Sequence, residues 1–210
     1  MIQNAGTKVL LDGSGRDRGD YSINGRQFHE EDRGQYDSPE EVFAFCGASA
    51  LLRRRMLEDV GLFDDSFFVY YEDMDLSWRA RLRGWKILYT PTSIVRHIHC
   101  GTSVEWSPFF TFHAERNRLN MLVKNAPAPF AARSCLAYVR DTLRLWRWSL
   151  VRRFNRDSVS ARASSKQAFI KSRVLVSIAR RLPMLLWRRA AIRGRRVVGD
   201  VEIMSWMVEA

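Results

Sequence analysis

FFVYYEDMDLSWRARLRGW, residues 67–85, places three acidic residues between a run of aromatic residues and a helix. Its first five residues are all aromatic or β-branched and form an apolar approach to the helix. Glu72 and Asp73 then fall in the first turn of a helix predicted over residues 72–83, which Gly84 ends in the position that favours a left-handed residue. Unpaired N–H groups and the helix dipole stabilise negative charge at that end, so acidic residues there are, on this evidence, ordinary helix-end charges.

Asp75 lies in the same predicted helix and precedes Arg79 by four residues. That spacing puts the two side chains on neighbouring turns of one helix face. An ordinary surface ion pair is therefore the expected arrangement for these two residues.

The pattern of apolar residues around this helix predicts an α/β fold. Residues 4–27 are punctuated by glycines and are expected to form turns and loop with at most a short strand. The other predicted elements are strands over residues 8–11, 42–52, 85–89 and 93–99 and helices over residues 54–60 and 109–124.

The charge of the chain is divided unevenly along its length. Residues 1–125 carry 16 Lys and Arg against 18 Asp and Glu, whereas residues 126–210 carry 18 against 5. The sequence NAPAP, residues 125–129, marks the point where composition shifts to Arg, Leu and Trp at helical spacing. We therefore expect two regions, an α/β domain over residues 1–125 and a basic helical tail over residues 126–210.

Composition disfavours several classes of protein. The longest uncharged run, residues 42–52, is shorter than the roughly 20 apolar residues that span a bilayer, and the N-terminus lacks the apolar core of a signal peptide. Cys46, Cys100 and Cys135 include no close pair, which argues against a disulfide framework or a thiolate zinc site. These features predict a cytoplasmic globular protein.

The basic tail has the pattern of an amphipathic helix. Apolar residues at helical spacing with bordering arginines suit a peripheral location on the anionic inner face of the plasma membrane. Packing of two helices on the α/β domain is the alternative, and nucleic-acid binding ranks behind both because no nucleic-acid motif accompanies the charge. The apolar stripe consists of Leu136, Val139, Leu143, Trp146 and Leu150, and the bordering arginines are Arg140, Arg144 and Arg147.

Residues 46–97 carry a resemblance to a known family. They contain, in order, a Gly-Ala strand, an arginine-rich turn, the aromatic block ending in Glu-Asp, a strand running to Pro91, and His97 at the end of the next strand. This order resembles the acceptor-side part of glycosyltransferase family 2, which consists of inverting enzymes of GT-A fold. The flanks IQNAG and ERNRLNMLVKN are similar to its bacterial rhamnosyltransferase-like branch. The resemblance covers residues 2–125 and implies a partial GT-A domain followed by the basic helical tail.

The resemblance implies roles for several acceptor-side residues. In this family the Asp of the Glu-Asp pair is the general base that takes the proton of the acceptor hydroxyl, and Asp73 stands at that position. Glu72 and Asp75 are then expected to bind the acceptor, and the aromatic run to wall the sugar site. Arg116 stands where the family carries a basic segment that faces the acceptor or a phosphate.

His97 stands where the histidine of the family approaches the metal-bound diphosphate of the donor. The resemblance therefore implies a divalent metal, Mg or Mn, which acts as a Lewis acid for the leaving diphosphate. The alternative for His97 is a satisfied polar residue at a strand end. A zinc site built from His97, His99, Cys100 and His113 lacks a recognised spacing.

The nucleotide-binding half of the family, with its Asp-x-Asp metal motif, has no counterpart before the Glu-Asp pair. We therefore expect an N-terminally truncated or split enzyme that binds metal only together with that half. The expected function is transfer of a sugar such as rhamnose from a nucleotide-diphosphate donor to a lipid-linked or cell-envelope glycan acceptor. The alternative is a non-catalytic remnant, or a basic module that binds membrane or nucleic acid.

Overall fold

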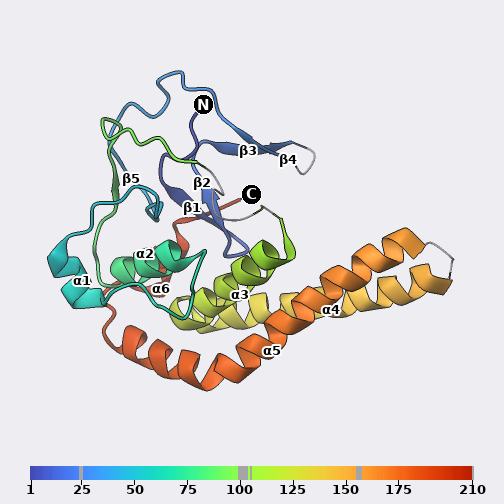
Figure 1. The fold of residues 1–210 in the computed structure, drawn as a ribbon. Coiled ribbons are helices and arrows are strands. Elements are labelled where there is room, and N and C mark those ends of the chain that lie inside the picture. The colour runs from blue at the N-terminus through green and yellow to red at the C-terminus, as the bar shows by residue number, and fades with distance from the viewer. Residues whose placement is uncertain (24–25, 99–103, 105, 155–157, 210) are drawn as a thin grey trace. The chain divides into compact units, whose positions relative to one another are not determined.

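The computed structural model of this chain describes residues 1–23, 26–98, 104, 106–154 and 158–209 (Figure 1). It is a mixed α/β structure of short strands and longer helices, as the sequence predicted. The chain forms two compact units, Met1–His99 together with Ala191–Ala210, and Cys100–Ala190. These units divide the chain at other points than the domain boundary expected after residue 125, which stays a prediction.

A three-stranded sheet lies in the first unit. β1 (Thr7–Leu10) pairs antiparallel with β2 (Gly15–Asp17), so that Thr7 is opposite Asp17, and parallel with β7 (Met207–Val208). The strand predicted over residues 8–11 is therefore confirmed as β1, shifted by one residue. The sheet joins the two ends of the chain, and the short helix α6 (Asp200–Met204) precedes β7.

Two antiparallel strand pairs accompany this sheet. Two strands, β2 and β3 (Asp20–Ile23), and the first half of β4 (Arg26–His29) lie in residues 4–27, which the sequence was expected to leave mostly as loop, so that expectation was wrong. Its glycines mark turns between short strands: Gly13 and Gly19 have φ of 79° and 107°, which side-chain-bearing residues rarely adopt. The pairs are β3 (Asp20–Ile23) with β4 (Arg26–His29), and β5 (Glu40–Glu41) with β6 (Leu88–Tyr89).

Residues 42–52, predicted as a buried strand, form only an isolated bridge between Ala44 and Thr7. The N–H of Val42 donates instead to the carbonyl of Ile87 at 2.9 Å. Val42 and Ala44 therefore bond to different segments of the chain. Residues 42–52 thus form no continuous ladder with a single neighbouring strand.

Both helices predicted on either side of the aromatic run are present. α1 (Arg54–Val60) has the predicted bounds, and α2 (Glu72–Leu82) ends one residue early. Leu76 and Ala80 of α2 bury against Met56 of α1 and form a small apolar core. This packing fixes α2, and with it the acidic residues at its first turn.

The two strands predicted after α2 are largely not formed. Only β6, at the end of residues 85–89, is a strand, and residues 93–98 have no regular structure. The last residue of the second predicted strand, His99, lies outside the described residues. The ladder is short, since two residues of β6 pair with two of β5.

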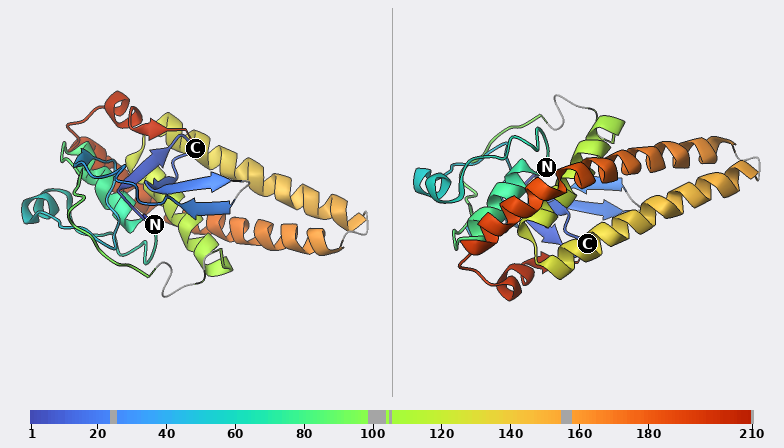
Figure 2. Two further views of the ribbon diagram at one scale, coloured as in Figure 1. Left: turned by 90° about the horizontal axis from the view of Figure 1, so that it is seen from above. Right: turned by 90° about the horizontal axis from the view of Figure 1, so that it is seen from below.

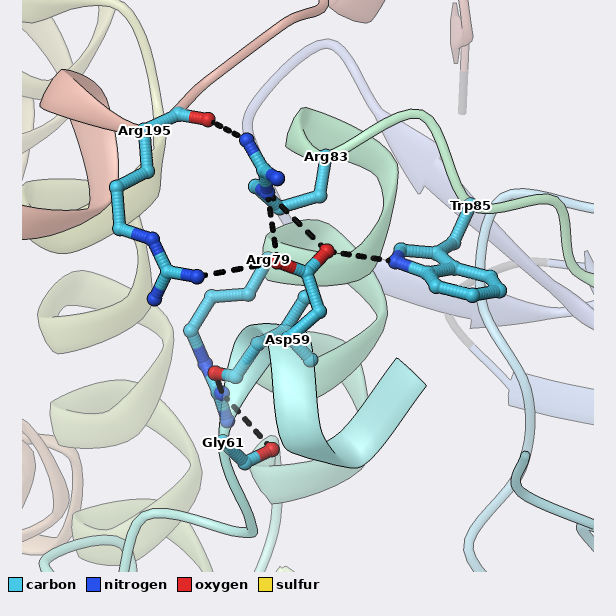
Figure 3. A network of polar contacts seen from close by, with 7 residues as sticks. Asp59, Gly61, Arg79, Arg83, Trp85 and Arg195 are labelled. Atoms are coloured by element: carbon cyan, nitrogen blue, oxygen red, sulfur yellow. Dashed lines mark hydrogen bonds and ion pairs between the residues drawn. The ribbon is translucent and has the colours of Figure 1, made fainter. Parts of the chain in front are cut away.

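A polar network around Asp59 fastens the C-terminal segment to α1 and α2 (Figure 3). The Asp59 carboxylate accepts hydrogen bonds from Arg83 Nε (3.1 Å), Trp85 Nε1 (2.9 Å) and Arg195 Nη2 (3.1 Å). Arg83 also donates to the backbone carbonyl of Arg195. Residues 191–210 thus belong with the first unit through side-chain and sheet contacts.

Three helices form the second unit. α3 (Pro108–Asn125) confirms the helix predicted over residues 109–124, and its N-cap is Ser107, whose hydroxyl accepts from the Phe110 N–H. One core cluster is made of Leu119, Tyr138, Val174 and Ile178, which come from all three helices. The helices are α3 (Pro108–Asn125), α4 (Ala128–Phe154) and α5 (Ser158–Gly194), whose last turn passes into the first unit.

α4 and α5 lie side by side in both views of Figure 2. Trp146 Nε1 donates to Ser172 Oγ at 3.1 Å, and the hydroxyls of Ser149 and Ser165 are hydrogen-bonded further along. The partner numbers fall on α5 as they rise on α4, so the two helices run antiparallel. Within the described residues, no helix is long and apolar enough to cross a membrane.

Candidate functional site

The approach to α2 has an unusual backbone. Phe68, Tyr70 and Tyr71 have φ of 66°, 65° and 68°, in the left-handed region that bulky residues avoid. Each such residue costs about 1–3 kcal/mol and persists only where surrounding structure imposes it, most often at functional sites. Fully buried Phe67 anchors the run, and the Tyr71 hydroxyl accepts a hydrogen bond from the Gly15 N–H at 3.3 Å. The aromatic run therefore holds the first turn of α2 against β2.

Asp73 is held at this first turn by backbone donors. Its Oδ2 accepts from the Gly47 N–H at 2.9 Å, and its Oδ1 accepts from the Met74 N–H at 2.7 Å. Burial raises the pKa of the Asp73 carboxyl, and the N–H groups of Gly47 and Met74 oppose part of that rise. The result is an oriented carboxylate that binds a proton more readily than an exposed aspartate does, which is what a general base requires.

Glu72 contributes a second carboxylate beside Asp73. Burial raises the pKa of Glu72, and the negative charge of Asp73 raises it further. Its Oε2 is buried and has no hydrogen-bond partner among the residues that the structure describes. Because a buried polar atom without a partner costs free energy, this oxygen is suited to accept a hydrogen bond from a ligand.

Asp17, in β2, is a third carboxylate that the sequence reasoning missed. Its Oδ1 accepts from Thr7 Oγ1 at 3.3 Å, and Asn4 Nδ2 donates to the same hydroxyl at 3.3 Å. Burial raises the pKa of Asp17 to about 6, with smaller contributions from the charges of Asp20 and Asp73. β2 meets the start of α2 through the hydrogen bond between Gly15 and Tyr71. No motif marked Asp17, since only the pairing of β1 with β2 places it here.

Cys46 belongs to the same neighbourhood. Burial raises the pKa of its thiol, and the charges of Asp17, Asp73 and Glu72 raise it further. Burial and the negative charge around the start of α2 therefore keep this thiol uncharged. The segment that carries Cys46 and Gly47 contacts the start of α2 through the hydrogen bond from Gly47 to Asp73.

Asp75 is paired with Arg79, as the four-residue spacing predicted, with Arg79 Nε 3.0 Å from Asp75 Oδ2. The pair is buried rather than on the surface, which corrects the expected location. Arg79 also donates to the carbonyls of Val60 and Leu62, so the pair ties α2 to the turn after α1. The Asp75 side chain has no exposed surface in this structure. Acceptor binding by Asp75 stays a prediction.

His97 is exposed, and its Nδ1 lies 3.3 Å from the side-chain amide nitrogen of Gln3. In the described part of the chain, no three His, Cys, Asp or Glu side chains are grouped so that they could hold a metal ion. The described residues therefore do not fit a divalent metal by themselves. Of the zinc ligands considered above, His99 and Cys100 lie outside the described residues.

Arg116 is a buried residue of α3, in the second unit. Its Nε donates to Asn117 Oδ1 at 2.9 Å, and burial lowers the pKa of its guanidinium, with the charge of Arg181 adding to the effect. One turn further, fully buried Asn120 has no hydrogen-bond partner for either amide atom within the described chain. The acceptor-binding role of Arg116 stays a prediction.

The family model described as glycosyl transferase family group 2 matches residues 19–151, more than half of the chain. The chain belongs to this family. The match includes the aromatic run and the Glu72–Asp73 pair that the geometry singles out, together with α3 and most of α4. The family resemblance inferred from residues 46–97 is thereby confirmed, whereas its finer branch is not settled by this match.

Two similar proteins come from Mycobacterium tuberculosis, strains CDC 1551 / Oshkosh and ATCC 25618 / H37Rv. Each is named N-acetylglucosaminyl-diphospho-decaprenol L-rhamnosyltransferase and is 41% identical to this chain over 51 residues. Those residues are 24% of this chain and 17% of each relative, so the match spans less than a fifth of the relatives' length. No solved structure matches the chain significantly.

Proposed function

We propose that this chain supplies the acceptor side of an inverting glycosyl transfer. The transferred group is a sugar such as rhamnose, the donor is a nucleotide-diphosphate sugar, and the acceptor is a lipid-linked or cell-envelope glycan. Family membership supports the reaction class, and the names of the two mycobacterial relatives support the choice of sugar and acceptor. The observation that carries the proposal is the oriented carboxylate of Asp73, whose proton affinity burial increases.

Asp73 acts as the general base in this proposal. The acceptor hydroxyl oxygen forms a bond to the anomeric carbon of the donor while its proton passes to the Asp73 carboxylate. The bond from that carbon to the diphosphate breaks, the electron pair leaves with the diphosphate, and the configuration at the carbon inverts. The N–H groups of Gly47 and Met74 hold the carboxylate in one orientation during the transfer. Proton transfer is faster from this fixed orientation than from a freely rotating side chain.

The neighbouring groups position the acceptor. The buried, unpartnered Oε2 of Glu72 is placed to accept a hydrogen bond from a second hydroxyl of the acceptor sugar. The aromatic residues before α2 offer apolar ring surface to the carbon-bound hydrogens of a sugar, and exposed Phe68 is the clearest candidate. Acceptor recognition thus combines carboxylate oxygens with an aromatic wall.

In this proposal a divalent metal, Mg or Mn, binds together with the diphosphate of the donor. When bound, such an ion neutralises charge on the leaving diphosphate. His97 is the one residue of this chain proposed to lie near it. Since the described residues form no metal site alone, the other ligands are expected from the donor and from a nucleotide-binding half.

Two alternatives remain open to experiment. A non-catalytic remnant would keep acceptor binding but have no turnover with any nucleotide-binding half. A nucleic-acid module would use the basic residues of 126–210 and would bind duplex DNA with a steep dependence on salt. The location proposed for the transferase is peripheral, on the inner face of the plasma membrane.

The test is the substitution Asp73→Asn in the protein joined to a nucleotide-binding half. Asn keeps the size of the side chain and one acceptor for the Gly47 N–H but cannot take a proton. Turnover with a nucleotide-diphosphate sugar and a lipid-linked acceptor should fall by about two to four orders of magnitude, the usual worth of general base catalysis. Asp65→Asn, which removes an exposed carboxylate before the aromatic run, is the matched control and should leave turnover within about twofold of wild type.

Thermal unfolding separates loss of the base from loss of the fold. Both variants should unfold within a few degrees of wild type. A variant at Asp73 that retains near-wild-type turnover refutes the base assignment, and absence of turnover in the wild-type fusion itself favours the non-catalytic alternative.

A further inference from the structure

The outer side of α4 exposes the apolar stripe that its sequence predicts. Large apolar side chains on folded proteins are usually exposed singly, whereas here several follow one helix face. Leu143 is 59% exposed and Leu150 is 55% exposed, although both belong to a helix that is packed on its opposite side. The exposed members are Leu136, Val139, Leu143, Trp146 and Leu150.

α5 exposes a second series of apolar side chains. Phe169 is 58% exposed and Val176 is 49% exposed. They lie seven residues apart, which is two helical turns, so they occupy one face of α5. Buried Ala168 and Val174 face the interior of the unit, which shows that this helix also has a packed side and an outer side.

The two apolar series lie on the same side of the helix pair. On α4, Leu150 and Leu143 follow Trp146, the residue that contacts α5, by about 40° and 60° around the helix axis. On α5, Val176 and Phe169 follow the contacting Ser172 by about 40° and 60° in the same rotational sense. Because the helices run antiparallel, an equal sense of rotation away from the contact line brings both series to one face. This face is called the hairpin face below.

Arginines surround the apolar residues on the hairpin face. α4 contains six arginines and a single acidic residue, and α5 contains nine Lys and Arg and no acidic residue. Guanidinium groups beside exposed apolar side chains fit a surface that offers both phosphates and acyl chains. The exposed arginines next to the apolar residues are Arg140, Arg144 and Arg147 on α4, and Arg162 and Arg180 on α5.

We propose that the hairpin face of α4 and α5 docks on an anionic lipid bilayer, with the apolar residues among the upper acyl chains and the arginines at lipid phosphates. A second copy of the chain fits this face poorly, since association would bring two arginine-rich surfaces together with only Asp141 to offset them. A lipid surface supplies the missing negative charge. The proposal does not depend on the transfer chemistry, because docking requires neither donor nor acceptor.

The experiment measures co-sedimentation of the full chain with vesicles of phosphatidylcholine containing about one third phosphatidylglycerol, at moderate salt. The test variant, Leu143→Ser with Phe169→Ser, removes one exposed apolar residue from each helix and leaves the buried contacts between them intact. We expect its partition coefficient to fall about tenfold or more. The matched control, Leu62→Ser with Val201→Ser, removes two exposed apolar residues from the first unit and should bind within about twofold of wild type.

A second variant tests the electrostatic part of docking. Arg144→Gln with Arg147→Gln should weaken binding to the anionic vesicles and leave the weak binding to pure phosphatidylcholine unchanged. Circular dichroism verifies that each variant keeps the helical content of wild type.

Three outcomes overturn the proposal. One is a Leu143/Phe169 variant that sediments like wild type. Another is a wild-type chain that ignores vesicles but shifts duplex DNA with a steep salt dependence, which assigns the arginines to nucleic acid. The last is a wild-type dimer that ignores vesicles and becomes monomeric in the Leu143/Phe169 variant, which assigns the face to self-association.

Discussion

The substitution Asp17→Asn should make the protein more stable above pH 6, although Asp17 has hydrogen-bonded neighbours. Asn retains an oxygen that can accept from Thr7 Oγ1 but carries no charge near Asp20 and Asp73. In the wild type, folding holds Asp17 in surroundings that oppose its ionisation. The folded protein therefore binds a proton at this site more tightly than the unfolded chain does.

The magnitude follows from the shift of the pKa from 3.8 to about 6. One pKa unit corresponds to about 1.4 kcal/mol, so the shift changes the unfolding free energy by at most about 3 kcal/mol. Because Asp17 is partly exposed to solvent, we expect a value between about 1 kcal/mol and this maximum. Because the folded pKa is raised, the wild type has this stability in full below pH 3.8 and loses it as pH rises through about 6. Asp17→Asn has no such loss, so its stability relative to wild type should grow across that range.

Urea unfolding at pH 4.5, 5.5, 6.5 and 7.5, followed by circular dichroism, measures the effect for wild type and Asp17→Asn. The difference in unfolding free energy between them should change by about 1–2 kcal/mol over this series, because the series begins above pH 3.8, and mostly below pH 6.5. Asp65→Asn, at an exposed position, is the control for the loss of a carboxylate. A difference for Asp17→Asn that stays constant from pH 4.5 to 7.5 refutes the electrostatic account of the acidic site.

Three further outcomes follow from the same structure. Asp59→Ala removes the acceptor shared by three donors and should lower the unfolding free energy in the same urea assay by about 1–2 kcal/mol. The control Glu58→Ala loses only an exposed ion pair and should change it by less than about 0.5 kcal/mol. Gly6→Ala should cost about 2 kcal/mol or more, because Gly6 has φ of 100° and an added Cβ would lie 2.6 Å from Val42 Cγ1; thermal unfolding at the wild-type midpoint would contradict this. In the protein joined to a nucleotide-binding half, kcat/KM should rise with pH through an apparent pKa above that of an ordinary aspartate, since Asp73 must lose its proton to act as base. A flat profile from pH 4.5 to 8 would count against Asp73 as the base.

Helices were the elements that could be predicted from sequence, because the signals that begin and end a helix are local. α1 and α2 end near Gly61 and Gly84, whose φ of 83° and 81° suit glycine, and α3 begins at a serine followed by proline. Strands were predicted poorly for the opposite reason. β1 obtains its partners from β2 nearby and from β7 at the far end of the chain, and no local pattern announces the second pairing.

The candidate site divides in the same way. Asp73 and Glu72 were identified from residues next to one another in the chain, and the family match to residues 19–151 includes them. Asp17 and Cys46 were not identified as site residues, because β2 and the segment before α1 reach the first turn of α2 only in the folded chain. The depth of Asp75 was also misjudged, since helical spacing predicts which residues pair but not what covers the pair.

What the sequence by itself determined is the set of features carried by neighbouring residues: the helices, the acidic pair at the start of α2, the family, and the basic amphipathic character of α4. Tertiary structure alone decided which groups share an environment. It raised the pKa of Asp73 and Asp17 by burial, left Glu72 Oε2 without a partner in the described chain, and put exposed apolar residues of α4 and α5 on one face. The physical reason is range, since hydrogen bonding and helix capping act over a few residues of chain, whereas desolvation and charge coupling depend on distance in space.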